Sequence, residues 1–310
     1  MAYGFYDETS PGMPNLLSVN GSLNTLLLTV LPLLGWAVEY GPTGNASVFR
    51  SPSGNRHRLN VRHDSAVSGS AALAYVRGAH TATSATAIGT PFPTAAQVPN
   101  ASSNWKAGIE DDAVTPARWA IFGDEKFFHY LCRSPSYGWD WHYFGQAPSD
   151  YATGYETVIK VRNSAGPYGA FGMGQASQAY PNASGGEFFA RGINATTVST
   201  GACCDGYGAA VGRMPNAPAT RGGYQNKILR EKISVHDTGV ASGTPGVLQI
   251  PKRIWLPNVW APQHSALGGG AADGDTFTDS VYNPSASFRL FDAPSYGTLI
   301  VETTNTWSKP

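Results

Sequence analysis

The sequence predicts an all-β protein with two β-rich domains of sandwich or barrel type, long Gly/Pro-rich loops and one short N-terminal helix. Three observations lead to this prediction. After residue 35, most hydrophobic segments alternate apolar and polar side chains, which is the period of a half-buried strand. The 36 glycines and 22 prolines supply turns between short strands. No repeat of 20–50 residues is visible, which argues against a solenoid or a propeller.

The one helical pattern lies near the N-terminus, over residues 22–31. A small residue at positions 20–22 can cap its start, and Pro32 is expected to end it. We expect this helix to close one end of a β domain. The alternative is that the segment docks on a neighbouring subunit through four leucines, namely Leu16, Leu17, Leu26 and Leu27.

Strand patterns fill the rest of the first half, and they resume in the last third of the chain. In the first half they cover residues 56–63, 118–122, 126–132, 139–143 and 155–162. The second and third of these flank Gly123-Asp124-Glu125 and predict a hairpin. Later strands are predicted at 228–235, 247–250, 288–291 and 298–303.

Between residues 165 and 226 glycine recurs every few positions and the hydrophobic period is lost. A stretch of this kind forms either a linker or long loops shaped by contact with something else. We therefore expect an N-terminal β domain at 1–165 and a C-terminal β domain at 166–310. The second domain would be preceded by the glycine-rich loop region 166–226.

The charge composition narrows the classes of function. The chain carries 21 basic and 21 acidic side chains, so its formal net charge is 0. Charged residues make up 14% of it, against roughly a quarter in an average soluble protein. This balance argues against specific nucleic-acid binding and against an acidic disordered tail. Because a free monomer normally stays soluble through surface charge, we expect partners to cover much of this surface.

Cysteine use and hydropathy bear on the compartment. Cys132, Cys203 and Cys204 are odd in number, and adjacent cysteines rarely bond to each other because the ring they close is strained. We expect three reduced thiols, which suits assembly in a reducing cytoplasm. The apolar run at 26–34 is too short to span a bilayer and follows no basic residue, so we expect neither a secretion signal nor membrane insertion.

Several motifs contain catalytic residue types without the spacing that catalysis needs. His63-Asp64-Ser65 has the residues of a hydrolytic triad, but neighbours on a strand point to opposite faces. Glu110-Asp111-Asp112 and Asp124-Glu125 offer paired carboxylates, but they lie in predicted loops and turns, where burial would not raise a pKa. We therefore expect no catalytic residue.

Metal and cofactor motifs are also not indicated. The segment that starts at Asp273-Gly274-Asp275 does not continue as a calcium loop and is better explained as a turn between strands. The seven histidines never pair with cysteines at zinc-ligand spacing, and no glycine-rich nucleotide motif is present. The sequence predicts no metal site and no cofactor.

Two predicted strand faces are candidates for binding. Arg56, Arg58 and Arg62 share one face of the 56–63 strand, and arginine favours carboxylate or phosphate contacts across interfaces. This face is either solvated or forms salt bridges to a partner subunit, and DNA contact is disfavoured because the chain is neutral. Aromatic side chains alternate at Trp139, Trp141 and Tyr143. They are expected to form a domain core, with a stacking platform for sugar rings as the alternative.

Ten short segments follow one another along the chain, namely Gly35-Trp36 and residues 46–50, 58–64, 75–78, 91–97, 118–132, 138–145, 260–264, 273–277 and 302–307. Taken in this order, they resemble β-rich virion structural proteins of tailed bacteriophages. The resemblance spans most of positions 35–150 and 250–307, and it rests on the order and spacing of these segments.

The resemblance implies a non-enzymatic component of the phage particle, made in the host bacterial cytoplasm and built into the virion in symmetric copies. Its partners would be copies of itself and other virion proteins of the capsid, the portal or neck, or the tail. The alternative within the same particle is a module that binds a receptor or a glycan through the 137–144 aromatics.

Overall fold

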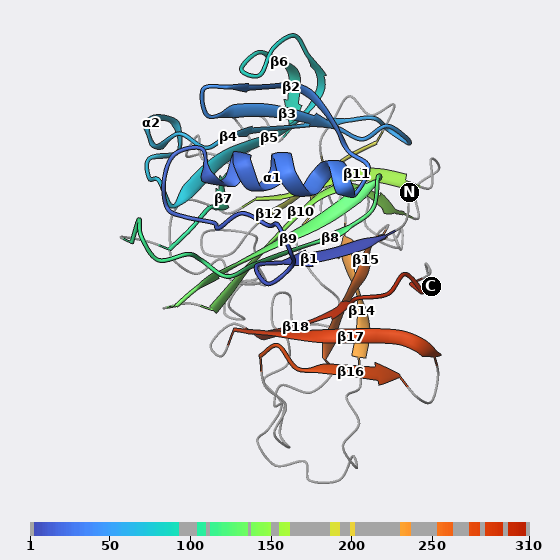
Figure 1. Cartoon of the computed structure of the whole chain (residues 1–310). Coiled ribbons are helices and arrows are strands. Elements are labelled where there is room, and N and C mark those ends of the chain that lie inside the picture. Colours follow the sequence, from blue (N-terminus) through green and yellow to red (C-terminus); the bar gives the residue numbers. More distant parts are fainter. Residues whose placement is uncertain are drawn as a thin grey trace, which may run out of the picture.

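The computed structural model confirms the predicted all-β class. In the part of the chain that it describes, 18 strands form three antiparallel sheets, and two helices accompany them (Figure 1). The described residues are 3–92, 104–109, 112–135, 138–149, 155–161, 187–192, 199–201, 230–236, 253–262, 273–279, 283–293 and 297–307.

We name the three sheets the central sheet, the N-sheet and the C-sheet. The central sheet has the order β1 (Gly4–Asp7), β8 (Trp119–Gly123), β9 (Phe127–Ser134), β10 (Gly138–Pro148), β11 (Tyr155–Val161), β12 (Glu187–Gly192) and β13 (Ser199–Gly201). The N-sheet has the order β2 (Ala37–Thr43), β3 (Ala46–Arg50), β4 (Arg58–Arg62), β5 (Leu73–Ala82) and β6 (Ile88–Phe92), and β7 (Asn104–Lys106) also pairs with β5. The C-sheet has the order β14 (Arg230–His236), β15 (Arg253–Pro262), β18 (Gly297–Glu302), β17 (Asn283–Ala293) and β16 (Thr276–Asp279).

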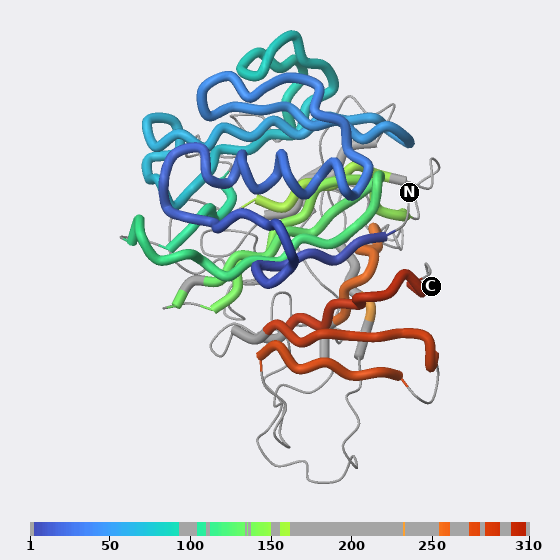
Figure 2. Tube along the Cα trace, viewed as in Figure 1, coloured from blue at the N-terminus to red at the C-terminus, as the bar shows by residue number. Residues whose placement is uncertain are grey.

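The central sheet lies between the other two sheets. On one face, Phe128 and Phe144 belong to a core shared with the N-sheet and with helix α1 (Ser22–Leu33). On the other face, Trp141 belongs to a core shared with Leu256 and Phe291 of the C-sheet. In Figure 2 the colours run from the blue N-sheet through the green central strands to the red C-sheet, and the blue β1 is the exception because it pairs with β8.

Helix α1 runs two residues beyond its predicted end. It starts after Gly21, which adopts φ 85° and forms no side-chain cap, and it continues through Pro32 to Leu33. The Trp36 N–H then closes the C-terminus on the Leu31 carbonyl at 2.9 Å. The second helix, α2 (Ser65–Ser68), is a single turn that follows β4.

The predicted hairpin at 118–132 is confirmed as β8 and β9. Asp124 shapes its turn, because its Oδ1 accepts the Lys126 N–H at 2.7 Å and the Phe127 N–H at 3.3 Å. Gly123 is required here, since it adopts φ 152° and a Cβ at this position would lie 2.2 Å from the Phe127 carbonyl oxygen. The turn therefore holds β8 and β9 in one register.

The predicted strands of the second half overlap β14, β17 and β18, whereas the one at 247–250 lies outside the described residues. Strands β12 and β13 come from the predicted loop region 166–226 and extend the central sheet beyond β11. The remainder of that region also lies outside the described residues. The division into domains 1–165 and 166–310 stays a prediction.

An ion pair joins the first strand to the C-sheet. Arg289 Nη1 of β17 lies 2.6 Å from Asp7 Oδ2 of β1, and the two side chains are only 18% and 9% exposed. Burial alone would raise the pKa of Asp7, but hydrogen bonds from Thr9 and Arg289 hold this pKa below its usual value. The pair therefore connects the N-terminal strand to a layer that is remote in sequence.

We expect Asp7→Asn to lower the free energy of unfolding by about 3 kcal/mol, because it leaves the Arg289 charge buried without its partner. The double variant Asp7→Asn/Arg289→Met should regain most of this loss, since it removes the orphaned charge as well. Urea denaturation of the wild type and both variants measures the effect. A double variant no more stable than Asp7→Asn would contradict the explanation.

Candidate functional site

The proposed leucine docking surface is not available in this structure. Leu16, Leu26 and Leu27 are fully buried and belong to the core between the N-sheet and the central sheet. Leu17 is half-buried. The interpretation of the three buried leucines as contacts to a neighbouring subunit is therefore wrong, because the chain's own sheets cover them. Their role is to pack α1 into the sandwich.

The predicted row of Arg56, Arg58 and Arg62 is wrong as a single strand face. Arg56 precedes β4 with φ 54° and is exposed, so it does not continue the alternation of the strand. Arg58 is neutralised within the chain, since its Nη2 donates to Glu39 Oε1 at 2.8 Å. Arg62 is half-buried and forms no ion pair in the described part of the chain. Arg62 therefore remains as the candidate.

The structure adds Tyr75 and Arg77, which the sequence interpretation did not include. In the register of β4 and β5, Tyr75 lies opposite Arg62, and Arg77 lies opposite Asn60. Directly opposite residues of an antiparallel pair share one face, so Arg62, Tyr75 and Arg77 gather on the side of the N-sheet that faces away from the central sheet. The signal was present in the sequence, because Tyr75 and Arg77 have the two-residue spacing of a strand face.

We call this side of the N-sheet the basic face. It carries four arginines, Arg50, Arg58, Arg62 and Arg77, and one acidic side chain, Glu39. Arg77 is 3% exposed, its Nε donates to the Tyr75 hydroxyl at 2.8 Å, and its guanidinium carbon lies 5.0 Å from the centroid of that ring. The basic face therefore concentrates positive charge in a chain whose net charge is 0.

The predicted glycan platform is wrong. Trp139 is 1% exposed, and Trp141 and Tyr143 are fully buried, so no sugar ring can reach them. They point from β10 toward the C-sheet, where Trp139 meets Phe291 edge to face at a centroid distance of 4.9 Å. The core interpretation of these aromatics is confirmed.

The indole N–H groups of this aromatic layer form hydrogen bonds with buried or half-buried polar side chains. Trp139 Nε1 donates to Asp273 Oδ1 at 2.7 Å, and Trp141 Nε1 donates to His129 Nδ1 at 2.9 Å. His129 Nε2 in turn donates to the Pro257 carbonyl at 2.8 Å. Burial lowers the pKa of His129 to about 3, so this histidine is neutral and joins the central sheet to the C-sheet.

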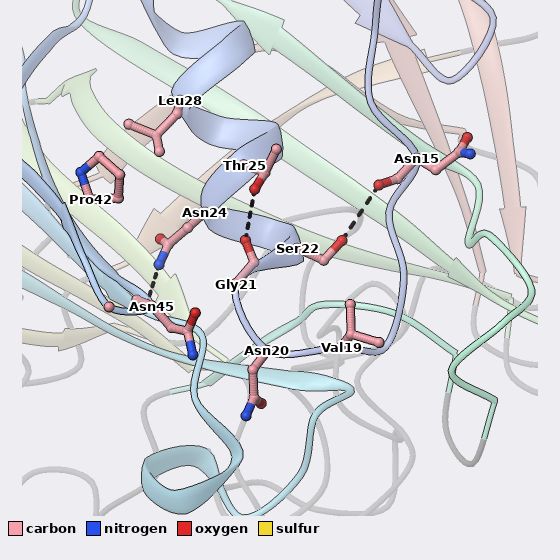
Figure 3. A pocket seen from close by; sticks show the side chains of 11 residues that line it. Asn15, Val19, Asn20, Gly21, Ser22, Asn24, Thr25, Leu28, Pro42 and Asn45 are labelled. Atoms are coloured by element: carbon pink, nitrogen blue, oxygen red, sulfur yellow. Dashed lines mark hydrogen bonds between the residues drawn. The ribbon is translucent and has the colours of Figure 1, made fainter.

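A shallow polar pocket of about 460 Å³ lies between the start of α1 and the turn that joins β2 to β3 (Figure 3). Four asparagines line it, namely Asn15, Asn20, Asn24 and Asn45, and no charged side chain does. Asn24 is almost fully buried, and its Nδ2 donates to the Asn45 carbonyl. Such a lining can hydrogen-bond to neutral groups, but it offers no acid or base.

His63 fixes the N-terminus of α1 through hydrogen bonds. Its Nδ1 accepts the Leu23 N–H at 2.9 Å, and its Nε2 donates to the Ala71 carbonyl at 2.8 Å. Burial lowers the pKa of His63, because the charged imidazolium is disfavoured away from water. Asp64 instead caps α2 through the Ala66 N–H at 3.0 Å. His63 and Asp64 therefore have separate structural roles and do not form a triad.

The other acidic motifs lie in turns or ion pairs. The expectation that burial would raise no pKa there is wrong for Asp124, whose pKa is raised by burial in the hairpin turn. Asp112 Oδ1 accepts the Val114 and Thr115 N–H groups, both at 2.9 Å, whereas Glu110 and Asp111 lie outside the described residues. Asp273 Oδ2 lies 3.4 Å from Arg118 Nη1 and precedes β16 in a turn. Among the residues whose positions are described, no group of three histidine, cysteine or carboxylate side chains could hold a metal ion.

Cys132 is a free, buried thiol, and burial raises its pKa to about 12. At neutral pH it is therefore protonated and unreactive. Cys203 and Cys204 lie outside the described residues.

No protein-family model matches the chain, and no curated protein sequence matches it. Within the described ranges, neither helix is long and apolar enough to cross a membrane.

We expect Trp141→Ala to lower the free energy of unfolding by about 3–5 kcal/mol, because it leaves a cavity in the layer between two sheets. The matched control is Val114→Ala, since Val114 is 83% exposed and its truncation should cost less than about 0.5 kcal/mol. Urea and thermal unfolding measure both. A Trp141→Ala variant of unchanged stability would contradict the core assignment.

We expect His63 to make the protein less stable as the pH falls. Its pKa is lowered in the folded state, so below about pH 6.5 the unfolded chain binds a proton that the folded chain does not. Stability is fully present above that pH and declines toward the folded-state pKa, at up to about 1.4 kcal/mol per pH unit. Urea denaturation at pH 8 and pH 5 should show a smaller loss in His63→Gln than in the wild type. Equal losses would contradict this role, since His129 titrates alike in both proteins.

Proposed function

We propose that the chain is a non-enzymatic structural component of a tailed-bacteriophage virion. It would be made in the host cytoplasm and would assemble in symmetric copies through contacts with itself and with capsid, neck or tail subunits. The resemblance of its ordered sequence segments to β-rich virion proteins is the starting point, and the use that the chain makes of its charged side chains supports it.

The observation that carries the proposal is that buried and half-buried polar side chains connect the layers of the fold. Asp7 pairs with Arg289 between β1 and β17, and Asp273 pairs with Arg118 across the central sheet and the C-sheet. His129 joins the same two layers through the Pro257 carbonyl. These groups are oriented by each other and do not converge on the polar pocket. Such cross-linking favours a rigid building block over a site for proton transfer.

The basic face supports assembly. A strand face with four arginines and one glutamate is suited to bind an acidic surface on another subunit, because arginine forms bidentate hydrogen bonds with carboxylates. The alternative of a glycan-binding module loses its proposed platform, since the side chains of Trp139, Trp141 and Tyr143 are inside the core.

We expect gradient-purified particles of the phage that encodes the chain to contain it at a constant copy number, measured by quantitative mass spectrometry. Particles assembled without the gene should take up purified full-length chain to the same copy number, whereas complete particles should take up none. Separate analysis of heads and tails then locates it. A chain absent from purified particles, or one that binds complete and deficient particles equally, would contradict the proposal.

A further inference from the structure

Arg77 is a buried cation without a counter-charge in the described part of the chain. It is 3% exposed, and its hydrogen-bond partner is the neutral hydroxyl of Tyr75. Its Nη1 is buried without any hydrogen bond. Within the described structure, no carboxylate lies within ion-pair distance of this guanidinium. Removing a charge from water without a partner is costly, so this position favours a bound anion.

Other arginines in the protein show that this arrangement is unusual for it. Every other arginine that is not exposed and whose side chain is described lies within 4 Å of a carboxylate, apart from Arg62. These are Arg50 and Arg58 with Glu39, Arg118 with Glu8 and Asp273, Arg133 with Asp273, and Arg289 with Asp7. The two arginines without an acid, Arg62 and Arg77, are neighbours on the basic face.

The register places these groups next to one another on the basic face. Arg62 lies directly opposite Tyr75, and Arg77 lies on the adjacent diagonal, where Cα atoms are roughly 7–8 Å apart. Tyr75 accepts a hydrogen bond from Arg77 Nε, so its own O–H remains able to donate. Two guanidinium groups and one hydroxyl donor thus surround a position that can take the two oxygens of a carboxylate.

We propose that Arg62, Tyr75 and Arg77 form a carboxylate-binding site for a second copy of the chain, and that its occupant is the turn at Asp112. The proposal deepens the proposed function, because it rests on assembly in symmetric copies and names a contact between them. A site that receives a different surface of the next copy is heterologous, and such contacts build rings or helical stacks.

The charge balance of the chain and the exposure of Val114 identify the segment that would occupy this site. The net charge is 0, so a face with four arginines and one glutamate leaves an excess of acid elsewhere on the same chain. Asp112 is half-buried, forms no ion pair within the described ranges and follows Glu110 and Asp111 in the sequence. Val114, two residues later, is 83% exposed, so this turn projects an apolar side chain beside its acid. A second copy therefore carries both charge complementarity and a protruding contact.

Sedimentation velocity of the full-length chain over a range of concentrations tests the site. We expect the wild type to self-associate, and to do so more weakly at high salt because rim charges are screened. Arg62→Glu should weaken association by at least about tenfold, since it places a like charge opposite the acid. The matched control is Arg56→Glu, which makes the same charge change on an exposed arginine outside the site and should stay within about twofold of the wild type. Tyr75→Phe removes a single donor and should cause a smaller loss than Arg62→Glu.

A charge swap identifies the occupant. Asp112→Arg alone should weaken association as Arg62→Glu does, and an equimolar mixture of these two variants should regain it. Each variant is first shown by urea denaturation to be folded, so that loss of association is not loss of structure. Equal association of Arg62→Glu and Arg56→Glu, or a mixture that stays dissociated, would overturn the proposal.

Two further experiments test whether the site binds other anions, and whether the site and the proposed function can fail independently. Isothermal titration with inorganic phosphate and with duplex DNA should show no binding that depends on Arg62, and such binding would overturn the carboxylate assignment. Incorporation of Arg62→Glu into particles at the wild-type copy number would reject the site and leave the virion role intact. A wild-type chain that self-associates through Arg62 but is absent from particles would reject the virion role and leave the site intact.

Discussion

The structure depends on the burial of the central sheet on both faces. Along β10, Trp141 packs against the C-sheet and Phe144 packs toward α1 and the N-sheet, and both are fully buried. An aromatic side chain buries about 150–250 Å², which corresponds to about 4–6 kcal/mol of transfer free energy for each ring. Neither outer layer can be removed without exposing such rings. This constraint makes the N-sheet and the C-sheet parts of one cooperative packing arrangement around β9 and β10.

Two-sided burial also determines how the polar groups are used. A strand with apolar residues on both faces has nowhere to place a charge in water, so polar side chains that enter these layers need partners inside them. His129, Asp273 and Arg289 meet this need by binding groups on other layers. The same hydrogen bonds that satisfy them fix the relative positions of the sheets. Low charge and extensive cross-linking are therefore two consequences of one architecture.

The strands, the hairpin at Gly123-Asp124-Glu125 and the helix could be predicted from the sequence, because they depend on local periods and turn residues. The burial of the second face of β10 could not be predicted from the sequence. Asp140 and His142 alternate with the tryptophans, which is typical of a solvated face, yet both are buried, and His142 Nε2 accepts the Lys106 N–H from β7. Whether a polar side chain faces water or a distant strand is decided by tertiary contacts that no local pattern records.

The same limit explains why the sequence predicts Arg58 and Arg62 of the basic face but not Tyr75 and Arg77. Arg58 and Arg62 are equivalent in the alternation of β4, but Glu39 on β2 neutralises the first and leaves the second. The register of β4 with β5 then brings Arg77 beside Arg62. The polar pocket at α1 differs in energetic terms, because neutral amides left without a ligand cost far less than a buried cation without an anion. The larger free-energy cost of a missing partner is therefore at Arg77. For this reason we propose the basic face, and not the asparagine-lined pocket, as the surface on which a partner binds.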